Sequence, residues 1–296
     1  MVYSPARVIA ILCSFLMLFW RQQIKFKTND HDLHMEKMRS NESIITDASR
    51  ETGRQRIHFV TYGNDRFEKS KKRIVQEALE TGWFDTVKAY GPEDLPASFY
   101  EKDQYANIFA LPRGGGYWLW KFSLINQVMD ALSDGDFLIW TDAGCTINKD
   151  GEGRFQEYIN MVNNSQYDLL AFELRHRLAE YKWTTQRLLL AYDVLGNTSI
   201  TQSPQFASGA LVMQKGSHFR KWMDLIYRKV LDVDPWLITD KYNDESREMV
   251  SEFKDNRHDQ SVMSVAMKIV GCIKLLFDDM RGQLPGKPFH ATRIKE

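Results

Sequence analysis

Cysteine is scarce in this sequence, and neither sign of charge is in excess. Only three of the 296 residues are cysteines, and Lys+Arg and Asp+Glu both number 39. No long block of one charge sign occurs, so the chain lacks the broad basic surface that non-specific binding to nucleic acid requires. We therefore expect no nucleic-acid partner.

The few cysteines leave two alternatives open. Cys13 lies in an apolar run near the N-terminus, so Cys145 and Cys272 remain to form one disulfide or to stay two buried thiols. A domain of this length does not need a disulfide in order to fold. The sequence alone does not choose between them.

The motifs of two common hydrolase classes are also missing. The chain contains neither a G-x-S-x-G nucleophile elbow nor an H-E-x-x-H zinc motif. Their absence argues against the membrane-anchored hydrolase that Asp142 and His258 could otherwise suggest.

Long hydrophobic runs are absent except near the N-terminus. Val8 to Trp20 is an uncharged run of 13 residues between Arg7 and Arg21, shorter than the roughly 20 that a full bilayer span needs. No small-x-small cleavage site follows this run. We therefore expect residues 1–21 to be a short signal anchor rather than a cleaved signal peptide.

Three glycosylation acceptor sequences follow the anchor, at Asn41, Asn163 and Asn197. Such acceptors suit a domain in the secretory lumen, although tripeptides of this kind also arise by chance. We expect a single-pass type II protein of the Golgi or endoplasmic reticulum membrane with a luminal domain. A cleaved and secreted form is the alternative.

Residues 22–55 are polar and mixed in charge without sustained periodicity, which indicates a stem or linker. A weak apolar stripe at Leu33, Met35 and Met38 leaves open a helix that packs on the domain. Residues 56–296 are then a single domain.

Short apolar runs alternate with helical patterns throughout that domain. The pattern predicts strands at 57–62, 86–90, 137–140, 168–172, 208–213 and 272–277, and helices at 66–81, 117–132, 183–194, 217–231 and 259–270. Strands separated by helices imply parallel βαβ units, so we predict an α/β fold with a doubly wound, mostly parallel sheet in three layers. Ligands of such sheets bind beyond the carboxyl ends of the strands, which directs attention to the residues after Val60, Trp140 and Met213.

Asp142 follows the apolar run from Phe137 to Trp140 and opens a turn of small residues. A carboxylate at the carboxyl end of a central strand can hold a divalent cation that neutralises a diphosphate leaving group. The alternative is that Asp142 only caps the turn after its strand.

The segments around Asp142 resemble GT-A glycosyltransferases, which use nucleotide-sugar donors and have a Rossmann-like sheet. The similarity is greatest to a branch of polysaccharide-type enzymes with the motifs RG-x-GYW-x-WK, DAGC and RHDQS, present here as Arg113 to Lys121, Asp142 to Cys145, and Arg257 to Ser261. Each motif is short, so the resemblance depends on their joint order. It implies that Thr61, Tyr62 and Asn64 hold the nucleoside.

The resemblance also implies a metal site, with one departure. Gly144 stands where the family usually has a second carboxylate, which removes one expected ligand of Mn²⁺ or Mg²⁺. His290 resembles a late histidine that completes the metal site in glycogenin-like members, and imidazole suits Mn²⁺. Asp142 and His290 are therefore the candidate metal ligands, although a lone histidine is more often structural.

Two further segments could contact the donor. Gly114 to Gly116 would leave backbone N–H groups free to approach phosphate oxygens, with Arg113 and Lys121 adding charge-assisted contacts. A flexible turn before a helix with buried tryptophans explains the same glycines equally well.

Asp259 and Gln260 open the helix predicted at 259–270. Asp259 is a candidate helix N-cap, and this role alone explains its residue type. The functional interpretation directs it at the reacting sugar, as general base in an inverting enzyme or as a donor-positioning group in a retaining one. Gln260 joins the candidate nucleotide-sugar ligands.

The leading expectation is an enzyme that transfers a sugar from a nucleotide diphosphate to a hydroxyl of a glycan or glycoprotein, assisted by Mn²⁺ or Mg²⁺. Asp142 and Asp259 are its candidate catalytic residues. The alternative is a catalytically silent sugar-binding or scaffold protein that keeps the sheet, and Gly144 favours it.

Overall fold

The computed structural model describes residues 54–276, 279–280 and 284–294. Gln55 to Glu296 form one compact unit. The predicted anchor at 1–21 and almost all of the predicted stem at 22–55 lie outside the described residues. Within the described part, no helix has the length and apolar character that crossing a membrane requires.

The centre of the domain is a six-stranded sheet in the order β2-β1-β3-β6-β5-β7. Its strands are β1 (Ile57–Tyr62), β2 (Thr86–Tyr90), β3 (Phe137–Thr141), β5 (Leu169–Glu173), β6 (Ala210–Gln214) and β7 (Ile273–Leu276). All of them run in one direction except β6, which is antiparallel to both of its neighbours. The prediction of a mostly parallel sheet is confirmed.

The direction of β6 corrects one expectation about the ligand-binding edge. Thr141 at the end of β3 pairs with Ala210 at the start of β6, and Phe137 pairs with Gln214. The residues after Met213 therefore lie at the opposite edge of the sheet from Asp142. Ser208 and Gly209, which precede β6, lie beside the end of β3 instead.

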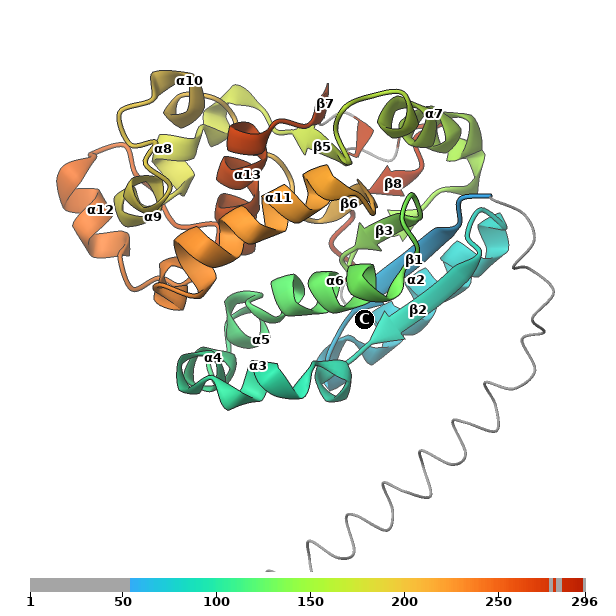
Figure 1. Ribbon diagram of the computed structural model, residues 1–296, viewed down its shortest axis with the longest axis horizontal. Helices are drawn as coiled ribbons and strands as arrows, with labels where there is room; N and C mark the ends of the chain where they lie inside the picture. The colour runs from blue at the N-terminus through green and yellow to red at the C-terminus, as the bar shows by residue number, and fades with distance from the viewer. Residues whose placement is uncertain (1–53, 277–278, 281–283, 295–296) are drawn as a thin grey trace, which may run out of the picture. The chain divides into compact units, whose positions relative to one another are not determined.

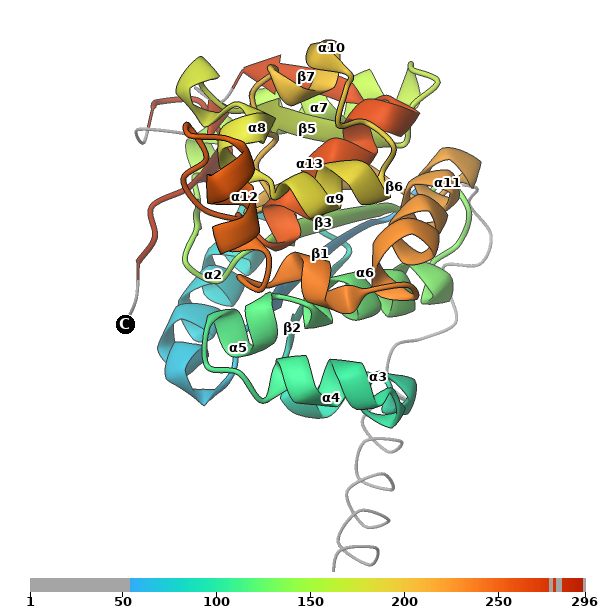
Figure 2. The ribbon, with the colours of Figure 1, turned by 90° about the vertical axis from the view of Figure 1, so that its left-hand side faces the viewer.

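Helices cover both faces of the sheet, as the three-layer prediction requires (Figures 1 and 2). Val60, Leu138 and Trp140 face one side, where the buried residues of α6 (Trp120–Ala131), α11 (Ser217–Ile226) and α13 (Asp259–Val270) join one core cluster. Phe59 and Ile139 face the other side, toward α2 (Glu68–Thr81) and α7 (Glu152–Asn163). This alternation is the period of two that a strand buried on both faces imposes.

Several helical boundaries differ from the predicted ones. The helix expected at 183–194 is interrupted, because Thr184 and Thr185 are extended between α8 (Glu180–Trp183) and α9 (Gln186–Ala191). The Thr185 side chain accepts a hydrogen bond from the Leu188 backbone and so starts α9. The helix expected at 117–132 begins at Trp120, after a left-handed turn.

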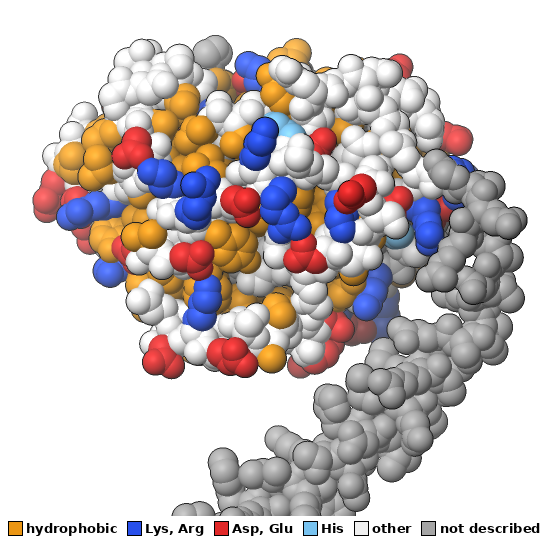
Figure 3. All heavy atoms as spheres, viewed as in Figure 1, with side chains coloured by type: hydrophobic (Ala, Val, Ile, Leu, Met, Phe, Trp, Pro, Cys, Tyr) orange, Lys and Arg blue, Asp and Glu red, His pale blue; other side chains and the backbone are white. Residues whose placement is uncertain are grey.

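The remaining elements are short and mostly unpredicted. They are α3 (Ala97–Glu101), α4 (Asp103–Phe109), α5 (Gly114–Tyr117), α10 (Thr198–Thr201), α12 (Asn243–Met249), the π-helical turn Tyr227–Leu231, and the 3₁₀ turns Asp65–Phe67, Pro92–Asp94, Lys149–Gly151, His176–Leu178 and Pro235–Ile238. A separate pair of short strands joins β4 (Thr146–Ile147) to β8 (Phe289–His290). On the face seen in Figure 3, basic and acidic side chains are interspersed, in agreement with the balanced composition.

Candidate active site

A buried lysine joins the two aspartates that the sequence singled out. The Lys121 side chain is fully buried on α6, and its Nζ lies 3.0 Å from Asp142 Oδ1 and 2.6 Å from Asp259 Oδ2. The Ser208 carbonyl oxygen lies 3.4 Å from the same nitrogen. One ammonium group therefore bridges the end of β3 and the start of α13. Asp259, at the start of α13, is 138 residues from Lys121 in the chain.

The two carboxylates determine the charge state of this lysine. Burial alone would lower the pKa of Lys121, but the negative charges of Asp142 and Asp259 outweigh it and raise the pKa above the usual range. The group is therefore a permanent cation at physiological pH. We refer to Lys121, Asp142 and Asp259 as the lysine-bridged centre.

Asp142 is held but not enclosed. Its Oδ1 accepts hydrogen bonds from Lys121 and from the indole nitrogen of Trp140, at 3.1 Å for the latter, while 39% of the side chain stays exposed. The turn after β3 is closed by the backbone, with the Cys145 amide donating to the Asp142 carbonyl. The carboxylate therefore is not needed as the cap of its turn, and it remains accessible to a ligand.

Asp259 does not cap its helix, contrary to the alternative drawn from the sequence. It is the first residue of α13, and His258 occupies the N-cap position without a side-chain capping bond. The Asp259 side chain is 7% exposed and directs Oδ2 at Lys121. The N-cap interpretation is wrong, because the buried ammonium is the stronger partner for this carboxylate.

Gln260 is held by a residue that the sequence analysis missed. Its amide nitrogen donates to Gln205 Oε1 at 2.7 Å, and the Gln205 amide donates to Ser261 Oγ and to the buried carboxylate of Glu180. Gln205 is fully buried. It fixes the first turn of α13, and nothing in the local sequence pattern pointed to it.

The candidate nucleoside ligands lie at the carboxyl end of β1. Tyr62 stacks on Trp120 with ring centroids 3.7 Å apart, which places this strand end against the start of α6. Asn64 uses its side-chain oxygen to accept a bond from the Arg66 amide. Thr61 is buried, and its hydroxyl oxygen has no hydrogen-bond partner among the described residues. Their role in holding a nucleoside stays a prediction.

Arg113 and Lys121, expected together at a diphosphate, lie in different surroundings. The Arg113 guanidinium pairs with Asp240 at 2.7 Å and with Asp255 at 3.0 Å rather than joining the lysine-bridged centre. The glycines between the two residues have positive φ angles, and at Gly116 a Cβ atom would lie 2.5 Å from the Cα of Phe109. Close packing therefore requires glycine at that position.

The described residues do not form a complete metal site around the candidate ligands. His290 is buried in β8, with Nε2 3.3 Å from the Leu284 carbonyl oxygen. No group of three or more His, Cys, Asp and Glu side chains suited to a metal ion occurs in the described part of the chain. Asp142 offers its Oδ2, so the donor set fits a cation shared with substrate phosphates and water rather than one held by protein alone.

The C-terminal segment packs closely against Gly144, which stands in place of a second carboxylate. The Gly144 carbonyl accepts bonds from the Ile294 amide at 2.9 Å and from the Thr292 hydroxyl at 3.0 Å. A Cβ at Gly144 would lie 3.3 Å from the Ile294 carbonyl oxygen. A longer side chain here would have to displace this backbone.

Cys145 and Cys272 are free thiols, which decides the alternative that the sequence left open. Cys145 is buried beside the lysine-bridged centre and its Sγ lies 3.4 Å from the Gly209 carbonyl oxygen. Burial raises the pKa of Cys145 to about 12, so this thiol stays protonated.

Comparison with known proteins finds similarity in solved structures only. No protein-family model matches the chain, and no curated protein matches its sequence. The apo form of mouse xyloside xylosyltransferase 1 is 10% identical with a TM-score of 0.40, covering 74% of this chain and 84% of that chain. A glycosyltransferase involved in glycosylation of the major capsid of PBCV-1 is 10% identical with a TM-score of 0.37, covering 79% and 92%.

A third similar structure is the galactosyltransferase LgtC in complex with donor and acceptor sugar analogues. It is 11% identical with a TM-score of 0.34, covering 73% of this chain and 72% of that chain. All three are described as glycosyltransferases, the class that the motifs resemble. The likeness is distant, so the proposal below is based on the residues of this chain.

Proposed function

We propose that this protein is a glycosyltransferase that moves a sugar from a nucleotide-diphosphate donor to a hydroxyl of a glycan or glycoprotein. The observation that carries the proposal is the lysine-bridged centre, in which Lys121 holds Asp142 and Asp259 at the carboxyl end of the central strands. Ligands of α/β sheets bind at this edge.

The geometry favours a positioning role for Asp259. Its Oδ2 already accepts a short hydrogen bond from the Lys121 ammonium, so this oxygen is engaged within the protein. Lys121 is enclosed, so it acts by holding Asp142 and Asp259 in fixed positions at the edge where the donor sugar is proposed to bind. Such preorganised groups stabilise developing charge without rearranging during the reaction.

Asp142 has the second role, at the diphosphate. One ammonium and two carboxylates leave the centre with an excess of negative charge, and the exposed oxygen of Asp142 can share a divalent cation with phosphate oxygens. When bound, Mn²⁺ or Mg²⁺ would neutralise charge on the departing diphosphate. Thr61, Tyr62 and Asn64 are proposed to hold the nucleoside, and Gln260 the donor sugar.

A silent sugar-binding or scaffold protein is the second candidate. The observation in its favour is Gly144, where packing against Ile294 takes the place of a second acidic ligand. Such a protein would keep the sheet and bind sugars without turning over a donor.

We also propose that the protein acts in the lumen of the Golgi or endoplasmic reticulum, anchored through residues 1–21. In support, Asn163 and Asn197 of two glycosylation acceptor sequences are exposed in the structure. If glycosidase treatment of the expressed protein leaves its electrophoretic mobility unchanged, the protein carries no such glycan, which would argue against this location.

The function is tested with the purified protein and a panel of nucleotide sugars, with and without Mn²⁺, read as release of the nucleoside diphosphate. An enzyme releases diphosphate from at least one donor, and the matching nucleotide plus Mn²⁺ raises its melting temperature by mass action. Sugar binding without release from any donor supports the silent alternative. Absence of both release and nucleotide stabilisation contradicts the enzymatic proposal.

A further inference from the structure

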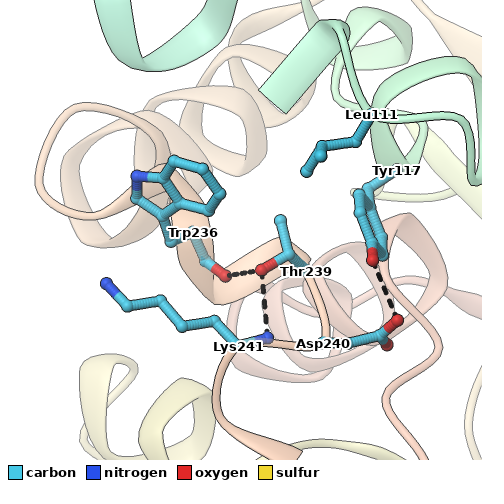
Figure 4. A pocket seen from close by; sticks show the side chains of 6 residues that line it. All are labelled: Leu111, Tyr117, Trp236, Thr239, Asp240 and Lys241. Carbon is cyan, nitrogen blue, oxygen red and sulfur yellow. Dashed lines mark hydrogen bonds between the residues drawn. The ribbon is translucent and has the colours of Figure 1, made fainter. Parts of the chain in front are cut away.

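A cavity lies apart from the residues of the lysine-bridged centre. It has a volume of about 330 Å³ and is lined by Leu111, Tyr117, Trp236, Thr239, Asp240 and Lys241. Figure 4 shows the rings of Trp236 and Tyr117 on opposite sides of the hollow, with Leu111 between them at its rim and Lys241 below. Its size is at the low end of the range for small-molecule sites, about 300–1,000 Å³.

Tyr117, which lines this cavity, belongs to a segment of strained backbone. Tyr117 and Trp118 have φ angles of 56° and 59°, and they continue a left-handed turn that starts at Gly114. His258, with φ 57°, packs against both, since Trp118 stacks on its ring and Tyr117 meets it edge-on with centroids 4.9 Å apart. Left-handed conformations of aromatic residues are costly and cluster at binding and catalytic sites.

The strained segment connects the cavity to the lysine-bridged centre. His258 directly precedes Asp259 in the chain, and its Nε2, buried without a hydrogen-bond partner among the described residues, lies 3.8 Å from Asp240 Oδ1. Tyr117 precedes Lys121 by four residues in the chain, and its hydroxyl donates to Asp240 Oδ2 at 2.9 Å. A ligand in the cavity therefore lies next to the residues that flank Lys121 and Asp259.

The two charged residues of the cavity differ in their surroundings, because Asp240 is bonded within the protein and Lys241 is exposed. Asp240 is occupied by Arg113, Tyr117 and Asn243, which bond to both of its oxygens. Lys241 is exposed, and its ammonium lies 5.7 Å from the ring centroid of Trp236 and 5.0 Å from that of Tyr242. The cavity thus offers two aromatic ring faces and one cationic donor at its rim.

We propose that this cavity binds a sugar ring of the acceptor glycan. A pyranose has apolar C–H faces and an edge of hydroxyl oxygens, which match the faces of Trp236 and Tyr117 and the ammonium of Lys241. The cavity is separate from the strand end of Tyr62 and Asn64, to which the nucleoside is assigned.

This inference rests on the proposed function, but its test separates the two. Binding of oligosaccharides is measured on a glycan panel with the full-length protein in the absence of any donor. Trp236→Ala removes the larger ring face, Trp236→Phe keeps an aromatic face, and Lys241→Ala removes the exposed cation. Tyr100→Ala removes an exposed aromatic ring outside the cavity and is the matched control.

We expect wild type and the Tyr100→Ala control to bind the same oligosaccharides with equal affinity. Trp236→Ala should weaken binding about tenfold or more, since buried aromatic anchors dominate such contacts, and Trp236→Phe should restore most of it. In transfer assays the effect should appear in KM for the acceptor more than in kcat. Glycan binding without donor turnover would contradict the proposed enzymatic function and would still support glycan binding in the cavity.

Two results overturn the assignment. One is a wild-type protein that binds no member of the panel. The other is a Trp236→Ala variant that is folded and binds glycans as tightly as wild type, which would place the acceptor elsewhere on the domain.

Discussion

Two places in this domain use the same arrangement, one cation between two carboxylates, in opposite surroundings. Lys121 bridges Asp142 and Asp259 with its own side chain fully buried. Arg113 bridges Asp240 and Asp255 at the surface, where 45% of its side chain is exposed. The composition of the two clusters is nearly identical, so the burial of the cation and of one carboxylate, Asp259, is the variable that separates them.

That difference determines what each cluster can do. Water screens the Arg113 pairs, and such exposed pairs contribute about 0–1 kcal/mol to stability. The lysine-bridged centre lies where charges interact strongly and cannot be replaced by solvent, so each of its members depends on the others. A buried, fully paired centre is suited to holding substrate groups in fixed positions, and an exposed one is suited to holding loops.

The largest effect is expected for Lys121→Met, which removes the cation from the buried cluster. Asp259 would be left as a nearly enclosed carboxylate without its partner, and breaking a buried pair in this way costs about 3–5 kcal/mol. Donor turnover should be lost as well. Chemical denaturation measures the stability change, and Lys102→Met, which breaks an exposed pair with Asp232, is the control. Equal stability of the two variants would contradict the comparison.

A much smaller effect is expected for Arg113→Met. The exposed pairs with Asp240 and Asp255 should contribute at most about 1 kcal/mol to folding. Because Arg113 also holds the cavity residue Asp240, the variant should bind acceptor glycans more weakly than wild type. Denaturation and glycan binding are measured on the same sample. A stability loss as large as that of Lys121→Met would show that exposure does not separate the clusters.

The smallest effect concerns pH and His258, which directly precedes Asp259 and lies near Asp240. The raised pKa of Lys121 keeps the centre charged, whereas burial lowers the pKa of His258, which also faces Arg113, Asp240 and Asp259. The unfolded chain takes up a proton at His258 first as the pH falls below about 6.5. Stability should therefore be complete above that pH and decline below it, down to the pKa of the folded state.

His58 also has a pKa lowered by burial and contributes to the same decline. The contribution of His258 is isolated by comparing wild type with His258→Asn. The melting temperature of both proteins is measured from pH 7.5 to pH 5. A decline of unchanged size in the variant would exclude His258 as its source.

Much of the sheet could be predicted from the sequence. Apolar runs such as Phe137 to Trp140 specify buried strands regardless of their neighbours, and α13 was placed at its observed bounds. The direction of β6 could not be predicted, because a buried strand has the same apolar pattern whether it runs parallel or antiparallel. Thr184 and Thr185 were absorbed into a helix because the capping bond of Thr185 is a local contact that periodicity does not detect.

The residues of the candidate site were predicted, but the ion pairs between them were not. Lys121, Asp142 and Asp259 were all named, yet Lys121 was expected to make a charge-assisted contact with a phosphate rather than to pair with the two aspartates. Lysine is seldom fully buried unless it is paired. The partners of Lys121 are 21 and 138 residues away along the chain, a separation that no local pattern encodes. Gln205 was missed for the same reason.

The most direct test of the central claim is donor turnover by Asp142→Asn. Asparagine keeps the shape of the side chain and removes its charge, while Lys121 retains its bond to Asp259. We expect release of the nucleoside diphosphate to fall by about 100-fold or more, with a cooperative melting transition close to that of wild type. Turnover at the wild-type rate by the folded variant would remove Asp142 from the mechanism and contradict the assignment of the lysine-bridged centre as the active site.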